Sequence, residues 1–252
     1  MNQFPMIKLT LSPIPEFLSV EKQKELTDRF IADNSQRVWN IPALKEVILT
    51  MSYGKCVYSE IKLNEEGKYM QIEHFYPKSR YPDKVLEWGN LMASSNICNA
   101  KKNDCDPYNT PIVNPFIDNP KDYFYIENGR IWPLNKSRKA INTLEKCDLN
   151  NHTHLRQVRY KIEQKLSEKL NICHSLYQYE AASAIKNLKS IMKSCGRKAA
   201  FSATKSTLIL SNSDYLSLKG LIKNDGYWDF EFDSLEQELS FCSLPKPKYE
   251  KS

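Results

Sequence analysis

Long apolar runs, internal repeats and low-complexity segments are all lacking in this sequence of 252 residues. No stretch approaches the roughly 20 consecutive apolar residues of a membrane-spanning helix, so we expect no membrane partner. The first residues show no charged segment followed by an apolar run, which argues against a secretory signal. The seven cysteines are odd in number and irregular in spacing, as is usual for reduced thiols. Together these absences predict a cytoplasmic protein.

Glycine is also scarce, with seven residues, and the charge balance is only mildly one-sided. A hydrophobic share of 41% and a charged share of 26% are ordinary for a globular protein and argue against a disordered chain. The net charge of +6 is compatible with a phosphate-bearing partner but does not require one. Charge alone therefore leaves nucleic-acid binding open.

The expected secondary structure changes three times along the sequence, which predicts four segments. They are N-terminal helices in residues 1–54, a compact strand–loop–helix core in 55–106, a hairpin and loop extension in 107–150, and a helical region in 151–252. Because no flexible linker separates them, we expect one integrated fold. The predicted fold class is α+β, mainly helical, with a small embedded unit and a β-hairpin extension.

Helix, strand and turn signals place the individual elements. In the N-terminal half they predict a helix over 19–34 capped by Ser19, a second helix from Pro42 to Gly54, a hairpin tip at 65–67, a strand over 69–74, an irregular stretch over 90–95 and a small helix from Asn96. In the C-terminal half they predict a hairpin whose turn is Asn128-Gly129, and two long helices joined near 171–178. Residues 203–252 show a mixed pattern without a clear prediction.

One short stretch carries residues suited to phosphodiester hydrolysis. The attacking water must lose a proton, and a neutral histidine such as His74 suits that task because its usual pKa is about 6.5. A divalent ion supplies positive charge at the scissile phosphate. Mg²⁺ prefers oxygen ligands, which Glu73 and Asn99 offer as a carboxylate and an amide. Because Glu73 and His74 are neighbours, the backbone must bend where the strand ends for both to reach one phosphate.

These residues belong to a longer pattern that resembles the HNH, or ββα-metal, nucleases. The pattern is Glu73-His74, then Asn90 before a leucine, then Asn99 after a cysteine, then Lys102. The resemblance implies a ββα-metal unit in which His74 is the general base and Glu73 and Asn99 hold Mg²⁺ or Mn²⁺. It also implies that Asn90 fixes the loop and holds the histidine backbone in place.

Three lysines near the motif are weaker candidates for contacts with nucleic acid. Lys78 follows the histidine, and Lys101 and Lys102 follow the second asparagine. Phosphate contacts explain such lysines, and a solvated charge cluster explains them equally well.

A larger set of stretches resembles one HNH subgroup and covers roughly residues 38–160. The stretches are Val38–Asn40, Lys55-Cys56, Glu73–Lys78, Leu86–Leu91, Asn114-Pro115 and Ala140–Arg156. The subgroup comprises the HNH proteins of Septu and retron-associated anti-phage systems, which are called PtuB. The resemblance implies a metal-dependent endonuclease that is the effector subunit of a bacterial defence complex. Its implied partners are a DNA or RNA substrate, a PtuA-like ATPase and, in some systems, a retron reverse transcriptase with its msDNA.

The sequence departs from the HNH family at the positions of a zinc clamp. Many HNH proteins hold structural zinc with two Cys-x-x-Cys pairs, but here the pairs read Cys56 with Ser59 and Ser95 with Cys98. A serine hydroxyl is a poor zinc ligand beside a thiolate, and structural sites need four nitrogen or sulfur donors. We therefore expect no structural zinc, and the question whether Cys105 substitutes as a ligand stays open.

Two further hypotheses remain beside the DNA endonuclease. The half-lost clamp is compatible with a catalytically silent subunit that uses the HNH shape to bind nucleic acid or to act as a scaffold. An HNH enzyme that cuts RNA, for instance tRNA, would carry the same motif. A cleavage assay that compares both substrates separates these hypotheses.

Overall fold

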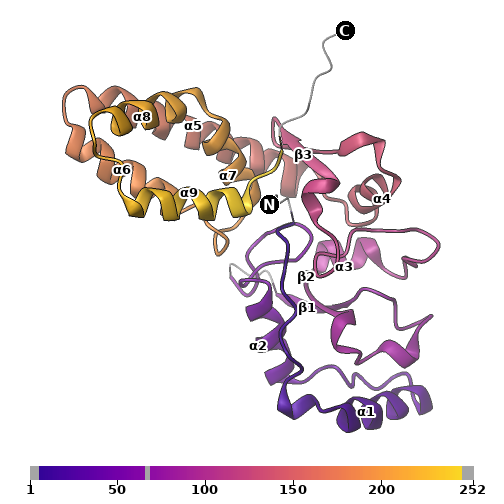
Figure 1. The fold of residues 1–252 in the computed structure, drawn as a ribbon. Coiled ribbons are helices and arrows are strands. Elements are labelled where there is room, and N and C mark those ends of the chain that lie inside the picture. The colour runs from indigo at the N-terminus through magenta and orange to yellow at the C-terminus, as the bar shows by residue number, and fades with distance from the viewer. Residues whose placement is uncertain (1–5, 66–68, 246–252) are drawn as a thin grey trace. The chain divides into compact units, whose positions relative to one another are not determined.

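The computed structural model describes residues 6–65 and 69–245, which form two compact units (Figure 1). One of them, here called the ββα unit, comprises residues 8–65, 69–118 and 136–149. The other, here called the helical unit, comprises the remaining described residues. The hairpin tip predicted at 65–67 falls largely outside the described residues. The fold class is as predicted, because helices dominate beside two small two-stranded sheets.

Two helices open the ββα unit. Helix α1 (Val20–Ala32) begins at Ser19, whose hydroxyl accepts a hydrogen bond from the Lys22 amide at 3.3 Å. Helix α2 (Pro42–Met51) begins with proline, which fits the first turn because the missing N–H would have no partner there. Gly54 follows at φ +73°, a conformation that favours glycine after a helix. Both predicted helices and the Ser19 cap are confirmed.

A small antiparallel sheet and a helix form the centre of this unit. Strand β1 (Met70–His74) pairs with β2 (Leu91–Ser95), and α3 (Asn96–Lys102) follows β2 without a loop and packs on both strands. The predicted first strand is confirmed. The irregular stretch predicted over 90–95 is wrong, since most of it is β2. All five residues of β2 are buried, so the alternation of polar and apolar residues that marks a one-sided strand is missing.

Helix α4 (Arg138–Lys146) completes the ββα unit and packs against α3. Its cap is Ser137, whose hydroxyl accepts from the Ala140 amide at 3.4 Å. The sequence predicted only a hairpin and loops over 107–150, so this helix was missed. Short turns of 3-10 or π type complete the described chain at Glu16–Leu18, Pro82–Lys84, Trp88–Asn90, Pro120–Asp122, Leu134–Lys136 and His152–Arg156.

A β-hairpin opens the helical unit. Strand β3 (Phe124–Glu127) pairs with β4 (Arg130–Pro133), and the turn residues Asn128 and Gly129 have φ values of +50° and +69°. Two positive φ values are the signature of the tight hairpin turn that Asn-Gly favours, so the predicted hairpin is confirmed. A Cβ at Gly129 would lie 2.6 Å from the Tyr160 amide nitrogen, so the close approach of these segments requires glycine.

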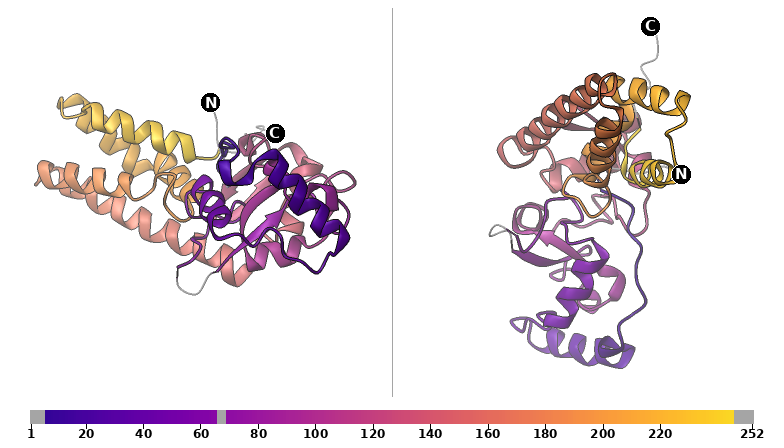
Figure 2. Two further views of the ribbon diagram at one scale, coloured as in Figure 1. Left: turned by 90° about the horizontal axis from the view of Figure 1, so that it is seen from below. Right: turned by 90° about the vertical axis from the view of Figure 1, so that its left-hand side faces the viewer.

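Two long helices follow in the helical unit and pack against each other (Figure 2). They are α5 (Gln157–Tyr177) and α6 (Ala181–Lys193). The sequence placed their junction near 171–178, but α5 continues through most of that range. Cys173 and Tyr177 are buried and extend the apolar face of α5 by one more turn, which explains the longer helix.

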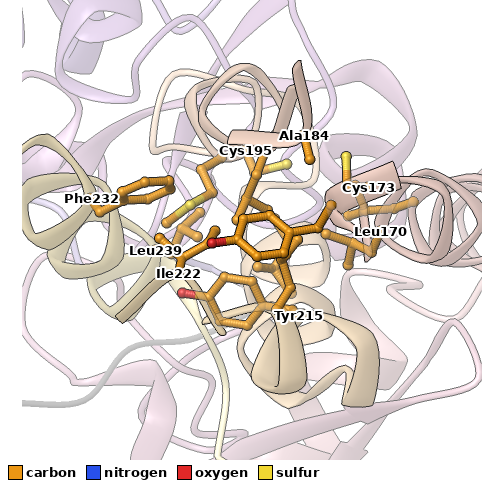
Figure 3. Packing of buried hydrophobic residues seen from close by; sticks show 14 residues of the cluster. Leu170, Cys173, Ala184, Cys195, Tyr215, Ile222, Phe232 and Leu239 are labelled. Carbon is orange, nitrogen blue, oxygen red and sulfur yellow. The ribbon is translucent and has the colours of Figure 1, made fainter. Parts of the chain in front are cut away.

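Three further helices lie where the sequence pattern was mixed. They are α7 (Ser202–Ser211), α8 (Ser213–Asn224) and α9 (Phe230–Cys242). Together with α5 and α6 they enclose an apolar cluster, in which the Tyr215 and Phe232 rings are fully buried (Figure 3). Among the described residues, no helix is both long and apolar enough to cross a bilayer.

Candidate active site

His74 is the last residue of β1, and its ring is nearly enclosed. Nε2 lies 3.0 Å from the Val85 carbonyl oxygen, and because a carbonyl only accepts, Nε2 carries the proton and Nδ1 is left as an acceptor. Burial, together with the charges of Lys78 and Lys102, lowers the His74 pKa to about 3. The imidazole is therefore neutral near pH 7, the state that a proton acceptor requires.

Glu73 is held in a buried ion pair. Its Oε1 accepts hydrogen bonds from Lys102 Nζ at 2.5 Å and from the Tyr58 hydroxyl at 3.3 Å. In the described part of the chain, Oε2 accepts no hydrogen bond. Burial raises the Glu73 pKa, although the Lys102 charge opposes that shift.

Lys102 is placed differently from the prediction. Its side chain is 0% exposed, and besides Glu73 it donates to the His74 carbonyl oxygen at 2.9 Å. The ammonium therefore links α3 to the end of β1 and does not face a phosphate in solvent. The neighbouring Lys101 is exposed on α3.

Asn99 lies one turn into α3, which begins at the Ser95 cap. Its Nδ2 donates to Gln71 Oε1 at 2.7 Å. Its Oδ1 accepts no hydrogen bond from any residue that the structure describes, so this amide oxygen is available to a ligand.

The structure brings the main predicted residues to one cavity of about 340 Å³. Glu73, His74 and Asn99 all line it, and so does Lys78. Both neighbours at the end of β1 line this cavity. Asp104 also lines this cavity and was missed, although its carboxylate lies only two residues after the motif lysine.

Asn90 does not line this cavity but organises the loop beside it. Its Nδ2 donates to the carbonyl oxygens of Tyr76 and Lys84 at 3.1 and 2.8 Å, and its Oδ1 accepts from the Tyr76 amide at 2.6 Å. Its backbone carbonyl accepts from the Phe75 amide at 2.9 Å. These contacts begin one residue after His74, so they give Asn90 a positioning role.

The four positions of the family's zinc clamp do meet in the ββα unit. The buried Cys56 thiol contacts the Cys98 thiol, the Ser59 hydroxyl and backbone, and the Ser95 backbone. Cys105 stands apart and donates to a backbone carbonyl at 4.0 Å. Two thiols and two hydroxyls are a poor donor set for zinc. Within residues 6–65 and 69–245, no group of three or more His, Cys, Asp or Glu side chains is arranged to hold a metal ion.

Comparison with known proteins relates most of the chain to a curated protein. No family model matches the sequence. The chain is similar to the Septu protein PtuB of Bacillus thuringiensis, with 30% identity over 240 residues that span 91% of this chain and 92% of the relative. A match of that length extends well beyond the resemblance seen over residues 38–160.

Proposed function

Because the chain belongs to the family of the Septu protein PtuB, a subunit of an anti-phage defence system, we propose that it is the metal-dependent nuclease of such a system. The observation that carries this proposal is the cavity shared by Glu73, His74 and Asn99. It combines a neutral imidazole with two oxygen donors, and phosphodiester hydrolysis requires both functions.

The oxygen donors suit a hard divalent cation. Glu73 and Asn99 both line the cavity, and neither Glu73 Oε2 nor Asn99 Oδ1 accepts a hydrogen bond from another described residue. One carboxylate and one amide, with water and phosphate completing the shell, match the usual environment of Mg²⁺ or Mn²⁺. When bound, the ion supplies positive charge at the scissile phosphate. Lys102 holds the other oxygen of Glu73 and so fixes the orientation of the carboxylate.

His74 takes the proton from the attacking water in this proposal. The hydrogen bond from Nε2 to the Val85 carbonyl fixes the ring and leaves Nδ1 as the acceptor. Burial, and after it the charges of Lys78 and Lys102, lower the pKa of His74 and so weaken it as a base in the free protein. A bound phosphodiester brings negative charge that offsets the two lysine charges, so the imidazole becomes a stronger base when substrate is present. Lys78, on the cavity wall, stabilises the charge that builds on the phosphoryl oxygens.

Family membership also supports a partner. We propose a PtuA-like ATPase subunit, joined in retron-associated systems by a reverse transcriptase and its msDNA. The substrate is nucleic acid, and DNA and RNA share the phosphodiester that this chemistry attacks.

A cleavage assay tests the proposal. The full chain, purified with its ATPase partner, is incubated with plasmid DNA and with tRNA, in Mg²⁺ and in EDTA. We expect cleavage in Mg²⁺ but not in EDTA. For His74→Ala we expect the cleavage rate to fall at least about 100-fold, as is usual when a general base is removed. Because His74 is only 5% exposed, this variant also loses packing, so Asn99→Ala provides a second readout. Asn99→Ala is expected to raise the Mg²⁺ concentration needed for half-maximal cleavage.

The control is His154→Ala, which removes an exposed histidine of the helical unit and is expected to cut as fast as the parent. Parental rates in both His74→Ala and Asn99→Ala would show that this cavity is not the active site. Nucleic-acid binding by the parent without metal-stimulated cleavage would instead identify the silent subunit considered above. The tRNA arm decides between an enzyme for DNA and one for RNA.

A further inference from the structure

A second cavity, of about 500 Å³, adjoins the proposed active site within the ββα unit. The two cavities share three wall residues, Ile72, Lys78 and Asn99. Because Asn99 is a proposed metal ligand, the second cavity begins beside the position of the scissile phosphate. The hydrolysis described so far makes no use of this space.

The charged side chains of the second cavity are all cationic. They are Arg37, in the connection between α1 and α2, Lys45 on α2, and Lys78 at the boundary with the first cavity. Within the described ranges, none of the three forms an ion pair. By contrast, the buried Lys55 and Lys102 of the same unit are both paired with glutamates. Unneutralised cations that line one cavity are typical of a site for an anionic ligand.

Trp39 lines the second cavity and contacts the boundary lysine. Lys78 Nζ lies 5.0 Å from the centre of the Trp39 ring, within the range of a cation–π contact. The His74 ring meets the same indole edge-on at a centroid distance of 5.0 Å. The proposed base and the boundary cation are therefore held by one aromatic side chain. The other polar residues of the second cavity are neutral and are Asn34, Ser35, Asn40 and Gln71.

We propose that this second cavity binds the phosphodiester backbone on one side of the cut, with Arg37 and Lys45 contacting phosphates beyond the scissile one. The inference rests on the proposed function for its substrate class, a nucleic acid. Contacts to phosphates carry no direct sequence information, so these contacts strengthen binding and set the register of the strand without selecting a sequence. The neutral amides and the Trp39 ring complete a wall suited to the sugar and base of a flanking nucleotide.

The test is a binding measurement that needs no catalysis. The full chain and its Arg37→Gln/Lys45→Gln variant are titrated in EDTA against labelled DNA and RNA duplexes and single strands, at several salt concentrations. We expect the variant to bind at least about tenfold more weakly. Affinity falls as salt rises, and each phosphate contact adds about 0.7–0.9 to the steepness of a plot of log affinity against log salt. We therefore expect this plot to be less steep for the variant by about 1.5.

The matched control is Arg138→Gln/Lys146→Gln. These two side chains are exposed on α4 and line neither cavity. Their substitution removes the same net charge as the Arg37→Gln/Lys45→Gln variant. The control is expected to keep the parental affinity and slope. Equal weakening in both double variants would show an effect of net charge alone and would overturn the proposal.

The outcomes separate this inference from the proposed function. Parental binding by Arg37→Gln/Lys45→Gln refutes the second cavity as a strand site, whether or not the protein cuts nucleic acid. Weakened binding in that variant, with a parent that shows no metal-stimulated cleavage, supports the cavity and refutes the nuclease. A parent that binds none of the probes overturns the inference outright.

Discussion

The two units are stabilised in different ways. In the helical unit, five helices enclose an apolar cluster whose largest members include Tyr215 and Phe232. In the ββα unit, the interior also holds two lysine–glutamate ion pairs, Lys55–Glu60 at 2.7 Å and Lys102–Glu73 at 2.5 Å, with no side chain of these more than 4% exposed. The helical unit buries a charged side chain too, that of Arg159, which donates to the Gly129 carbonyl oxygen at 2.8 Å. A buried charge is costly unless it is paired, whereas an apolar side chain needs only to be packed. The ββα unit therefore depends on buried ion pairs as well as on packing, whereas the helical unit depends mainly on the packing of its apolar cluster.

The largest effect we expect comes from breaking a pair in the ββα unit. Lys102→Met leaves the Glu73 carboxylate buried beside an apolar side chain, which lowers the free energy of unfolding by about 3–5 kcal/mol. Hydrogen exchange followed by mass spectrometry over β1 and α3, in metal-free protein, measures the loss in this unit alone. The double variant Glu73→Gln/Lys102→Met removes both charges and is expected to recover most of the lost stability.

The counterpart in the helical unit is Leu188→Ala, which empties volume inside the apolar cluster. It is expected to lower the free energy of unfolding by about 2–5 kcal/mol, and the loss does not involve charge.

If the double variant Glu73→Gln/Lys102→Met proves as unstable as Lys102→Met, ion pairing is not what stabilises the ββα unit, and the contrast between the two units fails.

A smaller effect concerns a buried carboxyl in the helical unit, that of Glu163. Burial raises the pKa of Glu163 to about 7, against the opposing effects of the Gly129 backbone and Arg159. An acid whose pKa is higher in the folded state binds protons more tightly there, so its contribution to stability is greatest below about pH 4.5 and declines as the pH rises to about 7. Glu163→Gln removes this decline and is expected to stabilise the unit by about 1 kcal/mol above pH 7. Thermal unfolding of parent and variant across this pH range measures the difference, and parallel curves would contradict it.

The smallest effect is expected from metal removal in the ββα unit. With two thiols and two hydroxyls at the clamp positions, a zinc chelator should shift the unfolding temperature of the parent by less than about 1 °C. The double variant Ser59→Cys/Ser95→Cys supplies the missing thiolates and is expected to gain a zinc-dependent rise in that temperature. A marked fall in the parent on chelation would identify a zinc site that relies on another ligand.

The fold was predictable where a local signal determined the structure. Ser19 marked the start of α1, and Asn128-Gly129 marked the hairpin, because in each case one or two residues dictate the backbone. Strand β2 was missed because it is buried throughout and so shows no alternation. The extension of α5 became clear only with the partner helices against which Cys173 and Tyr177 pack.

The candidate site was predictable as far as its motif extends. The spacing of Glu73, His74 and Asn99 pointed to residues that the fold places around one cavity. Arg37 and Lys45 precede the motif by more than twenty-five residues, and only tertiary structure brings them to the adjoining space. Burial is likewise a tertiary property, so the sequence allowed no distinction between an exposed Lys101 and a buried, paired neighbour.

That neighbour, Lys102, has a mechanical consequence. One ammonium is bonded both to the carboxylate of the proposed ligand Glu73 and to the carbonyl oxygen of the proposed base His74, while its own helix carries the other proposed ligand, Asn99. The three groups are therefore linked, and a small displacement of α3 against β1 moves them together. A force applied to the outer face of this helix would misalign the whole set in a single motion, without reaching into the cavity.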